Sequence, residues 1–103
     1  MKTKHSIQIA FGEVKTQAEN LQNCAEDLRQ VQRQLEQIKQ SLSAGWQGNG
    51  ASRFIGKCEQ LEEKIKKSAC NVEKISEVIR TTAKGYYDAE LRALEIAQQR
   101  KVH

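Results

Sequence analysis

The sequence predicts an all-α protein in which two long helices fold back on each other as an antiparallel hairpin. Two observations lead to this prediction. Apolar residues recur at alternating three- and four-residue spacing on both sides of the centre, and three of the six glycines gather between the two runs. Such spacing is typical of helices with an apolar seam, and glycine leaves a helix with positive φ at little cost. The lack of proline and the 29% of charged residues also fit long helices.

The first helix is expected over residues 7–43, approximately. Its apolar residues keep a seven-residue repeat through about five heptads, which favours a coiled-coil-like seam. Ser6 is the expected N-cap, although Ile9 stands where a capping box would need Glu or Gln. Gly12 is the weak point, at roughly 1 kcal/mol relative to alanine. The repeat consists of Ile7, Ala10, Val14, Leu21, Cys24, Leu28, Val31, Leu35, Ile38 and Leu42.

Residues 44–50 form the expected turn, and Asn49 is the expected N-cap of a second helix over about 51–84. Gly85 then marks an end or hinge, and residues 85–103 keep a helical pattern that we expect to fray without a partner. The second helix repeats the 3–4 spacing with Ala51, Phe54, Cys58, Leu61, Ile65, Ser68, Val72, Ile75, Ile79 and Thr82.

Two helices of similar length with a short connection are expected to be antiparallel neighbours within one domain, residues 1–103. Such a pair buries little apolar surface, so we expect a second chain to complete the core. Ile55, Ala69 and Val78 add apolar surface beside the main repeat of the second helix. The predicted seam of the hairpin and its dimer comprises Leu28, Leu35, Leu42, Phe54, Leu61, Ile65, Val72 and Ile79.

The residues offer little for catalysis, and we expect no enzyme, metal, cofactor or small-molecule substrate. His5 and His103 lie at the ends of the sequence, and no glycine loop has the pattern of a phosphate site. Three cysteines without a C-x-x-C motif are neither a disulfide framework nor a zinc site. Cys24 and Cys58 are expected as small buried apolar groups, and Cys70 as a surface thiol, with a Cys24–Cys70 bridge as the alternative.

The net charge of +4 is compatible with an anionic partner but does not require one. Bases and acids are interleaved, as from Glu59 to Lys67, which is typical of a solvated helix face. We expect no cleavable signal peptide, and no apolar run approaches the ~20 residues of a membrane span.

The tripeptide Trp46-Gln47-Gly48 stands in the middle of the chain, between the two heptad runs. A chain of this length with Trp-x-Gly in its connecting turn resembles the WXG family of small exported helical hairpins, substrates of type VII (ESX) secretion. Phe54 matches the family's aromatic residue early in the second helix. Tyr86 and Glu90 match its Tyr-x-x-x-Asp/Glu motif, and i,i+4 spacing places both on one helix face.

The resemblance implies that two hairpins, of one kind or of two paralogous kinds, pack into a four-helix bundle. It also implies that Trp46, Gly48, Tyr86 and Glu90 form a composite export signal read by the secretion ATPase. The protein would then be made in the bacterial cytoplasm and act outside the cell or at its surface, as a secreted factor or as the targeting partner of a larger substrate.

Other interpretations of the same residues stay open. Trp46 and Tyr86 continue the apolar pattern, so they could simply be packing residues, and Gly48 could simply permit the turn. Two rival functions are a cytosolic coiled-coil adaptor or chaperone, and a basic helical binder of nucleic acid or anionic membranes, although we expect neither nucleic acid nor membrane as the partner.

Overall fold

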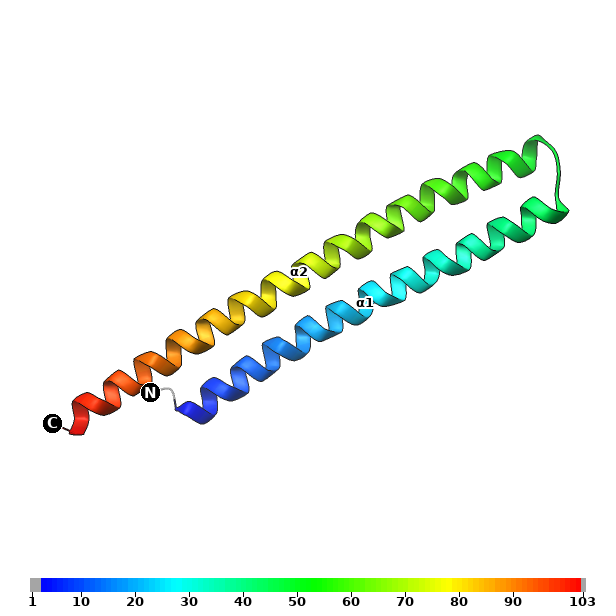
Figure 1. Cartoon of the computed structure of the whole chain (residues 1–103). Helices are drawn as coiled ribbons and strands as arrows, with labels where there is room; N and C mark the ends of the chain where they lie inside the picture. Colours follow the sequence, from blue (N-terminus) through cyan, green and yellow to red (C-terminus); the bar gives the residue numbers. More distant parts are fainter. Residues whose placement is uncertain (1–2, 103) are drawn as a thin grey trace. The chain divides into compact units, whose positions relative to one another are not determined.

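The structure is a computed structural model that describes residues 3–102, with side chains for residues 3–100. It contains two helices, α1 (Lys4–Gly45) and α2 (Asn49–Val102), joined by residues 46–48 (Figure 1). Within the described residues there is no strand. The prediction of an all-α protein made of two helices is confirmed.

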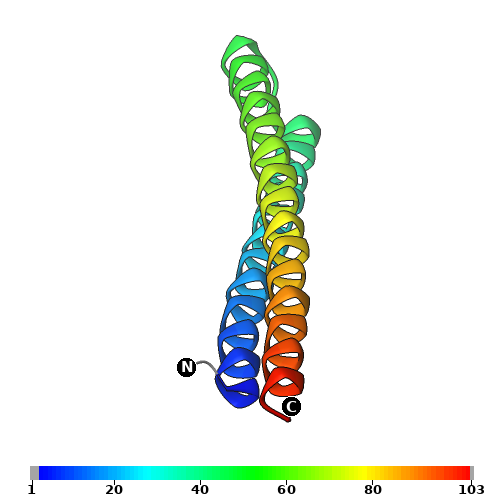
Figure 2. The same ribbon diagram turned by 90° about the vertical axis from the view of Figure 1, so that its left-hand side faces the viewer.

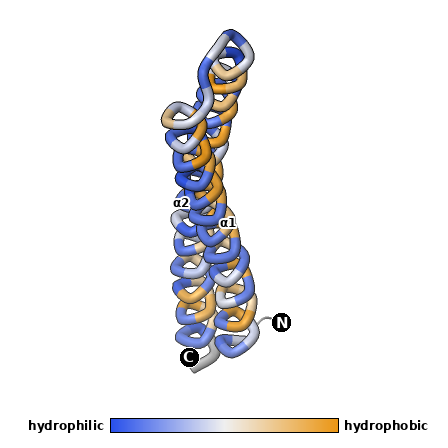
Figure 3. The backbone as a smooth tube through the Cα atoms, turned by 90° about the vertical axis from the view of Figure 1, so that its right-hand side faces the viewer, coloured by the Kyte–Doolittle hydropathy of each residue, from blue (hydrophilic) through white to orange (hydrophobic). Residues whose placement is uncertain are grey.

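The contacts within the chain define two compact units. Unit 1 consists of Met1–Leu21 and Lys74–His103, and unit 2 consists of Gln22–Glu73. Each unit pairs a stretch of α1 with a stretch of α2 that runs antiparallel to it (Figures 1 and 2). Figure 3 shows hydrophobic and hydrophilic residues alternating along both helices, as the heptad pattern requires.

The helix α1 begins at Lys4 rather than near residue 7, because Thr3 and not Ser6 caps it. The Ser6 N–H donates to Thr3 Oγ1 at 3.1 Å, and the Thr3 N–H donates to Ser6 Oγ at 3.0 Å. The Ile7 N–H donates to the Thr3 carbonyl at 3.0 Å, which starts the helical ladder. This reciprocal pair does the work of a capping box, with the Ser6 hydroxyl in the place that Glu or Gln usually takes.

The turn between the helices depends on Gly48, whose φ of 116° lies in the region that favours glycine. The Trp46 N–H donates to the Leu42 carbonyl at 2.8 Å, which closes the last turn of α1. The Gly48 carbonyl accepts from the Ser52 N–H at 3.1 Å, so the first helical hydrogen bond of α2 starts at Gly48. Asn49, the expected N-cap, is therefore already part of the helix.

The helix α2 continues through Gly85 to Val102, where we expected an end or hinge near residue 84. A single glycine costs a helix only about 1 kcal/mol, and the side chains around it are packed. Tyr87, Leu91 and Leu94 are half-buried beyond Gly85, and Tyr87 stacks on a ring of α1. This packing offsets the cost of the glycine.

On both helices, many of the buried side chains lie one residue after the positions that the apolar repeat predicted. Ala18, Ala25 and Ala69 have no exposed surface, because these small side chains let the helices approach closely. The helices are thus turned toward their small residues. The side chains buried or half-buried one residue after an expected position are Phe11, Ala25, Gln32, Lys39, Ile55, Glu62, Ala69, Ser76 and Ala83. Ala18 likewise follows Gln17, the one polar residue that interrupts the apolar repeat.

This rotation of the helices toward their small residues leaves larger apolar side chains on the surface. Of the predicted seam, Phe54 and Leu61 are exposed, and the other residues are half-buried. The prediction that Cys24 is buried is wrong, because Ala25 takes the inner position and Cys24 is exposed. The half-buried seam residues are Leu28, Leu35, Leu42, Ile65, Val72 and Ile79.

Candidate functional site

Unit 1 contains an apolar groove of about 520 Å³ between its two helical stretches. Tyr86 and Glu90, the two residues of the predicted C-terminal signal, both line this groove. Their spacing of four residues places them on one face of α2, one turn apart. The other lining residues are Ile7, Ala10, Phe11, Val14, Val78, Ile79, Thr82, Ala83 and Tyr87.

The two adjacent tyrosines have different surroundings. Tyr87 is half-buried, and its ring stacks on Phe11 with 4.6 Å between centroids and 29° between planes. Tyr86 is 70% exposed at the edge of the groove. The ring of Tyr87 therefore joins the two helices, whereas the ring of Tyr86 is accessible to a binding partner.

A close contact between the helices supports the groove. Ser76 is only 1% exposed, and its hydroxyl donates to the Ala18 carbonyl at 2.7 Å. Ala18 has no exposed surface, so the two backbones are near each other at this point. The hydrogen bond satisfies the buried hydroxyl and connects α1 to α2 within unit 1.

The Trp-x-Gly residues lie in unit 2, at the turn. Trp46 is 47% exposed, and its ring is tilted against that of Phe54 at a centroid distance of 6.3 Å. A Cβ at Gly50 would be 3.7 Å from Trp46 Cζ2, an ordinary contact distance. Trp46 thus rests on the first turn of α2 while half of its surface stays available. The structure brings Tyr86 together with Glu90 and Trp46 together with Phe54.

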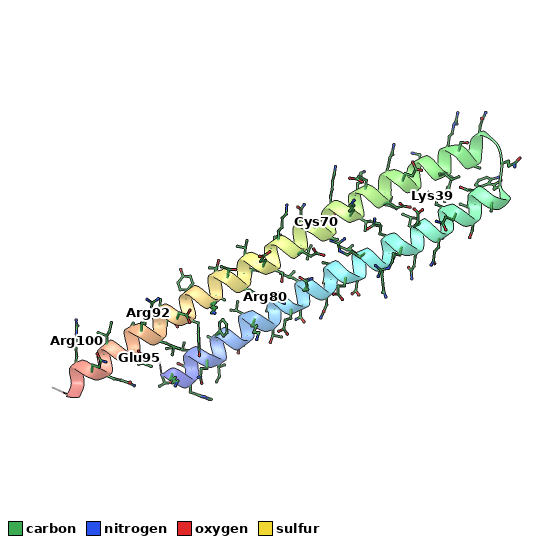
Figure 4. The ribbon with its side chains drawn as sticks, in the orientation of Figure 1. Lys39, Cys70, Arg80, Arg92, Glu95 and Arg100 are labelled. Carbon is green, nitrogen blue, oxygen red and sulfur yellow. The ribbon has the colours of Figure 1, made fainter. Side chains whose placement is uncertain are left out.

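A charged cluster occupies the helix contact of unit 2, and sequence reasoning missed it. Lys39 Nζ lies 2.7 Å from Glu36 Oε2, 3.7 Å from Glu62 Oε2 and 3.8 Å from Glu59 Oε1. Figure 4 shows Lys39 on α1 where it faces α2. Lys39 lies four residues after Leu35 and three before Leu42, and this spacing places it on the side of α1 that faces α2. That spacing was the signal in the sequence that could have revealed the cluster.

The Lys39 cluster shifts the titration of its members. The side chain of Glu62 is 15% exposed, and burial followed by the neighbouring Glu36 carboxyl raises the Glu62 pKa above its usual value. The hydrogen bond with Lys39 lowers the Glu36 pKa, and the same bond raises the Lys39 pKa. One Glu62 oxygen, Oε1, is buried without a hydrogen-bond partner. Glu62 is therefore the carboxyl of this cluster that gains a proton most readily.

A second ion pair in unit 2 involves Arg29. Its Nε donates to Glu73 Oε1 at 2.8 Å, which raises the Arg29 pKa and lowers the Glu73 pKa. Its Nη2 also donates to the Cys70 sulfur at 3.7 Å. All three cysteines are free: Cys58 is buried, and Cys70 is half-buried beside Arg29 rather than a fully exposed surface thiol.

The described residues contain no group of three or more His, Cys, Asp or Glu side chains that could hold a metal ion. None of their helices is long and apolar enough to cross a membrane.

Comparisons with known proteins found one family model and several relatives by sequence. A model of the family described as proteins of 100 residues with WXG matches residues 6–91, which include the turn, Tyr86 and Glu90. The relatives found include the type VII secretion system extracellular protein A of Staphylococcus aureus strains USA300 and Newman. Each is 26% identical over 77 residues, which cover 75% of this chain and 79% of the relative. No solved structure matches the chain significantly. The chain belongs to the WXG100 family.

Proposed function

We propose that this protein is a non-enzymatic substrate of a type VII secretion system, made in the bacterial cytoplasm and exported without a cleaved signal peptide. The observation that carries the proposal is the pairing of Tyr86 and Glu90 at the apolar groove of unit 1, in a chain of the WXG100 family. The type VII secretion system extracellular protein A is a relative by sequence, which supports export as the common function.

We further propose that Tyr86 and Glu90 dock on the secretion ATPase. Tyr86 offers an exposed ring, and Glu90 offers a carboxylate one turn away on the same face. An aromatic ring is a strong anchor for a pocket of a partner, and a neighbouring charge fixes its orientation. Trp46 and Gly48 would complete the signal at the turn, where Trp46 is half exposed.

The exposed apolar side chains support assembly with a second helical hairpin. Val31, Ile38, Phe54 and Leu61 are each between 45% and 49% exposed in unit 2. Large apolar side chains gathered on one surface mark an interaction site. A four-helix bundle, formed with a second copy or a paralogous hairpin, would cover them, and the assembly would act as a secreted factor or carry a larger substrate.

Export is tested by measuring the protein in culture medium and in cells of its source bacterium. We expect Tyr86→Ala and Glu90→Gln to lower the extracellular fraction at least about tenfold, while the cellular level is retained. Glu95→Gln is the matched control, because Glu95 is an exposed acid on the same helix outside the groove (Figure 4). If the wild type stays inside the cells in the absence of lysis, the proposal fails and an intracellular adaptor or chaperone becomes the better interpretation.

A further inference from the structure

Four exposed apolar side chains of unit 2, other than Trp46 at the turn, share one side of the helix pair. We call Val31 and Ile38 on α1, with Phe54 and Leu61 on α2, the apolar face. Both helices contact each other through positions one residue or four residues away from these side chains, and they run antiparallel, so the two stripes emerge on the same side. A polar groove on the other side is lined by Arg29, Gln32, Arg33, Glu36 and Glu62.

Four bases border this apolar face along α2. Arg53, Lys57, Lys64 and Lys67, here called the basic flank, follow one another at 3–4 spacing, with Gln60 between them and no acid on that stripe. Lys57 lies three residues after Phe54 and four before Leu61, so it neighbours both on the helix surface. All four bases are exposed. The basic flank and the α2 part of the apolar face therefore form one continuous surface.

Three of the four acids on this stretch of α2 pair with bases of α1 and not with the basic flank. This stretch of α2 carries Glu59, Glu62, Glu63 and Glu73, of which the exposed Glu63 lies four residues before Lys67 and has no inter-helix ion pair within the described part of the chain. Glu59 and Glu62 pair with Lys39, and Glu73 pairs with Arg29, both on α1. Among the residues that the structure describes, no ion pair involves any of the four flank bases. The contact between the helices thus separates the charges and leaves positive charge beside the apolar face.

The chain has no acidic stripe of its own to match the basic flank. In unit 2 the stripe of α1 that borders Val31 and Ile38 contains one acid, Asp27. Its other residues are Asn23, Gln30, Gln34, Gln37 and Ser41. In unit 1 the same border of α2 alternates in sign through Asp88, Arg92 and Glu95. A second copy therefore offers only isolated acids. Charges that border an apolar seam decide partner choice in paired helices. This charge pattern therefore favours pairing with a chain of different sequence over pairing with a second copy.

We propose that the apolar face and basic flank of unit 2 bind an amphipathic helix of another protein whose apolar seam is bordered by Glu or Asp at 3–4 spacing. This inference rests on the proposed assembly with a second helical chain, and it specifies which residues that chain presents at the contact. An apolar seam matches Phe54 and Leu61, which a nucleic acid would leave uncovered, and the acids match the four bases. Buried seam residues would supply affinity, and the charges would supply selectivity.

The test uses the full chain and two synthetic helices of about four heptads each. Both carry Leu and Ile on the seam, with Glu at the bordering positions of one peptide and Lys at those of the other. We expect calorimetry at low salt to show at least about tenfold tighter binding of the Glu peptide. The double variant Lys57→Glu/Lys64→Glu should lose this preference and favour the Lys peptide. Lys66→Glu is the matched control, because Lys66 is an exposed base outside the basic flank.

Three outcomes would overturn the inference. The first is equal binding of the two peptides by the wild type. The second is a stable homodimer, seen by sedimentation, that the Glu peptide does not displace. The third is binding of duplex DNA more tightly than of the Glu peptide, weakened as much by Lys66→Glu as by the double variant. Each result is separate from the proposed export function, because export is tested at Tyr86 and Glu90 and those residues are unchanged here.

Discussion

In unit 1 the helices meet through small and aromatic side chains, whereas in unit 2 charged side chains, among them Lys39 and Glu62, lie beside buried small ones such as Ala25 and Ala69. Unit 1 joins α1 to α2 with the Phe11–Tyr87 stack and the Ser76–Ala18 hydrogen bond. Unit 2 adds the ion pairs of Lys39 and Arg29 to its contacts between buried small side chains. Apolar contacts stabilise a helix pair directly, whereas partly buried ion pairs contribute less because each charge loses water.

The two units are therefore expected to differ in how they respond to substitution and to pH. We expect the largest loss of stability from a single side chain in unit 1, and the clearest response of stability to pH in unit 2. The charges of unit 2 also suit a specific pairing, since Arg29 and Lys39 of α1 meet acids of α2 in this alignment. Substitutions in each unit can test these two properties separately.

The largest effect is expected in unit 1 for Tyr87→Ala. The substitution removes a half-buried ring and its stack on Phe11, which should lower the free energy of unfolding by about 2 kcal/mol. Urea unfolding followed by circular dichroism measures this change. Tyr86→Ala is the control, because that ring is 70% exposed, and we expect a change within about 0.5 kcal/mol. Equal losses in the two variants would contradict the different environments of the tyrosines.

A smaller effect in unit 1 is expected for Ser76→Ala, at about 1 kcal/mol. The variant loses the buried hydrogen bond from the hydroxyl to the Ala18 carbonyl, which is 2.7 Å long. Ser68→Ala on the same helix is the matched control, because Ser68 is exposed and both variants gain the same helix propensity. The difference between the two unfolding free energies isolates the hydrogen bond, and a difference near zero would show that it does not stabilise unit 1.

Heptad spacing was sufficient to predict the two helices and the turn, because 3–4 repeats of apolar residues and clustered glycines are local signals. It was not sufficient to predict which side of each helix faces the other. Val31 and Ile38 fit the repeat better than Gln32 and Lys39 do, yet the structure turns Gln32 and Lys39 inward. Ala25 and Ala69 explain the choice, since close approach needs small side chains and a count of apolar positions does not weigh size.

The candidate site, like the fold, could be predicted from the sequence only in part. Tyr86 and Glu90 could be placed on one helix face from their spacing alone. That Ile7, Phe11 and Val14 form the other wall of their groove depends on the alignment of two distant segments, which local spacing does not contain. The Lys39 cluster was missed for a similar reason, because charged residues in a helix are usually solvated and only the partner helix shows otherwise.

The smallest effect is expected in unit 2, as a difference in the pH dependence of stability between the wild type and Glu62→Gln. Burial raises the Glu62 pKa above the reference value of 4.5, so the folded state binds a proton more readily than the unfolded chain. The resulting stabilisation is complete below the unfolded pKa and is lost as pH rises through the raised folded pKa. Glutamine imitates the protonated form, so we expect Glu62→Gln to be more stable than the wild type at pH 7.

The two proteins should approach the same stability as pH falls through the raised Glu62 pKa toward 4.5. Below that value both should weaken, because Glu36 and Glu73 have lowered pKa values and lose their pairing with Lys39 and Arg29 when they are protonated. Urea midpoints between pH 3 and 8 measure both trends. Glu63→Gln is the matched control, since Glu63 is exposed on the same turn, and its curve should run parallel to that of the wild type. If the Glu62→Gln curve is also parallel, unit 2 does not contain the pH-sensitive contact, and the contrast between the units is one of packing alone.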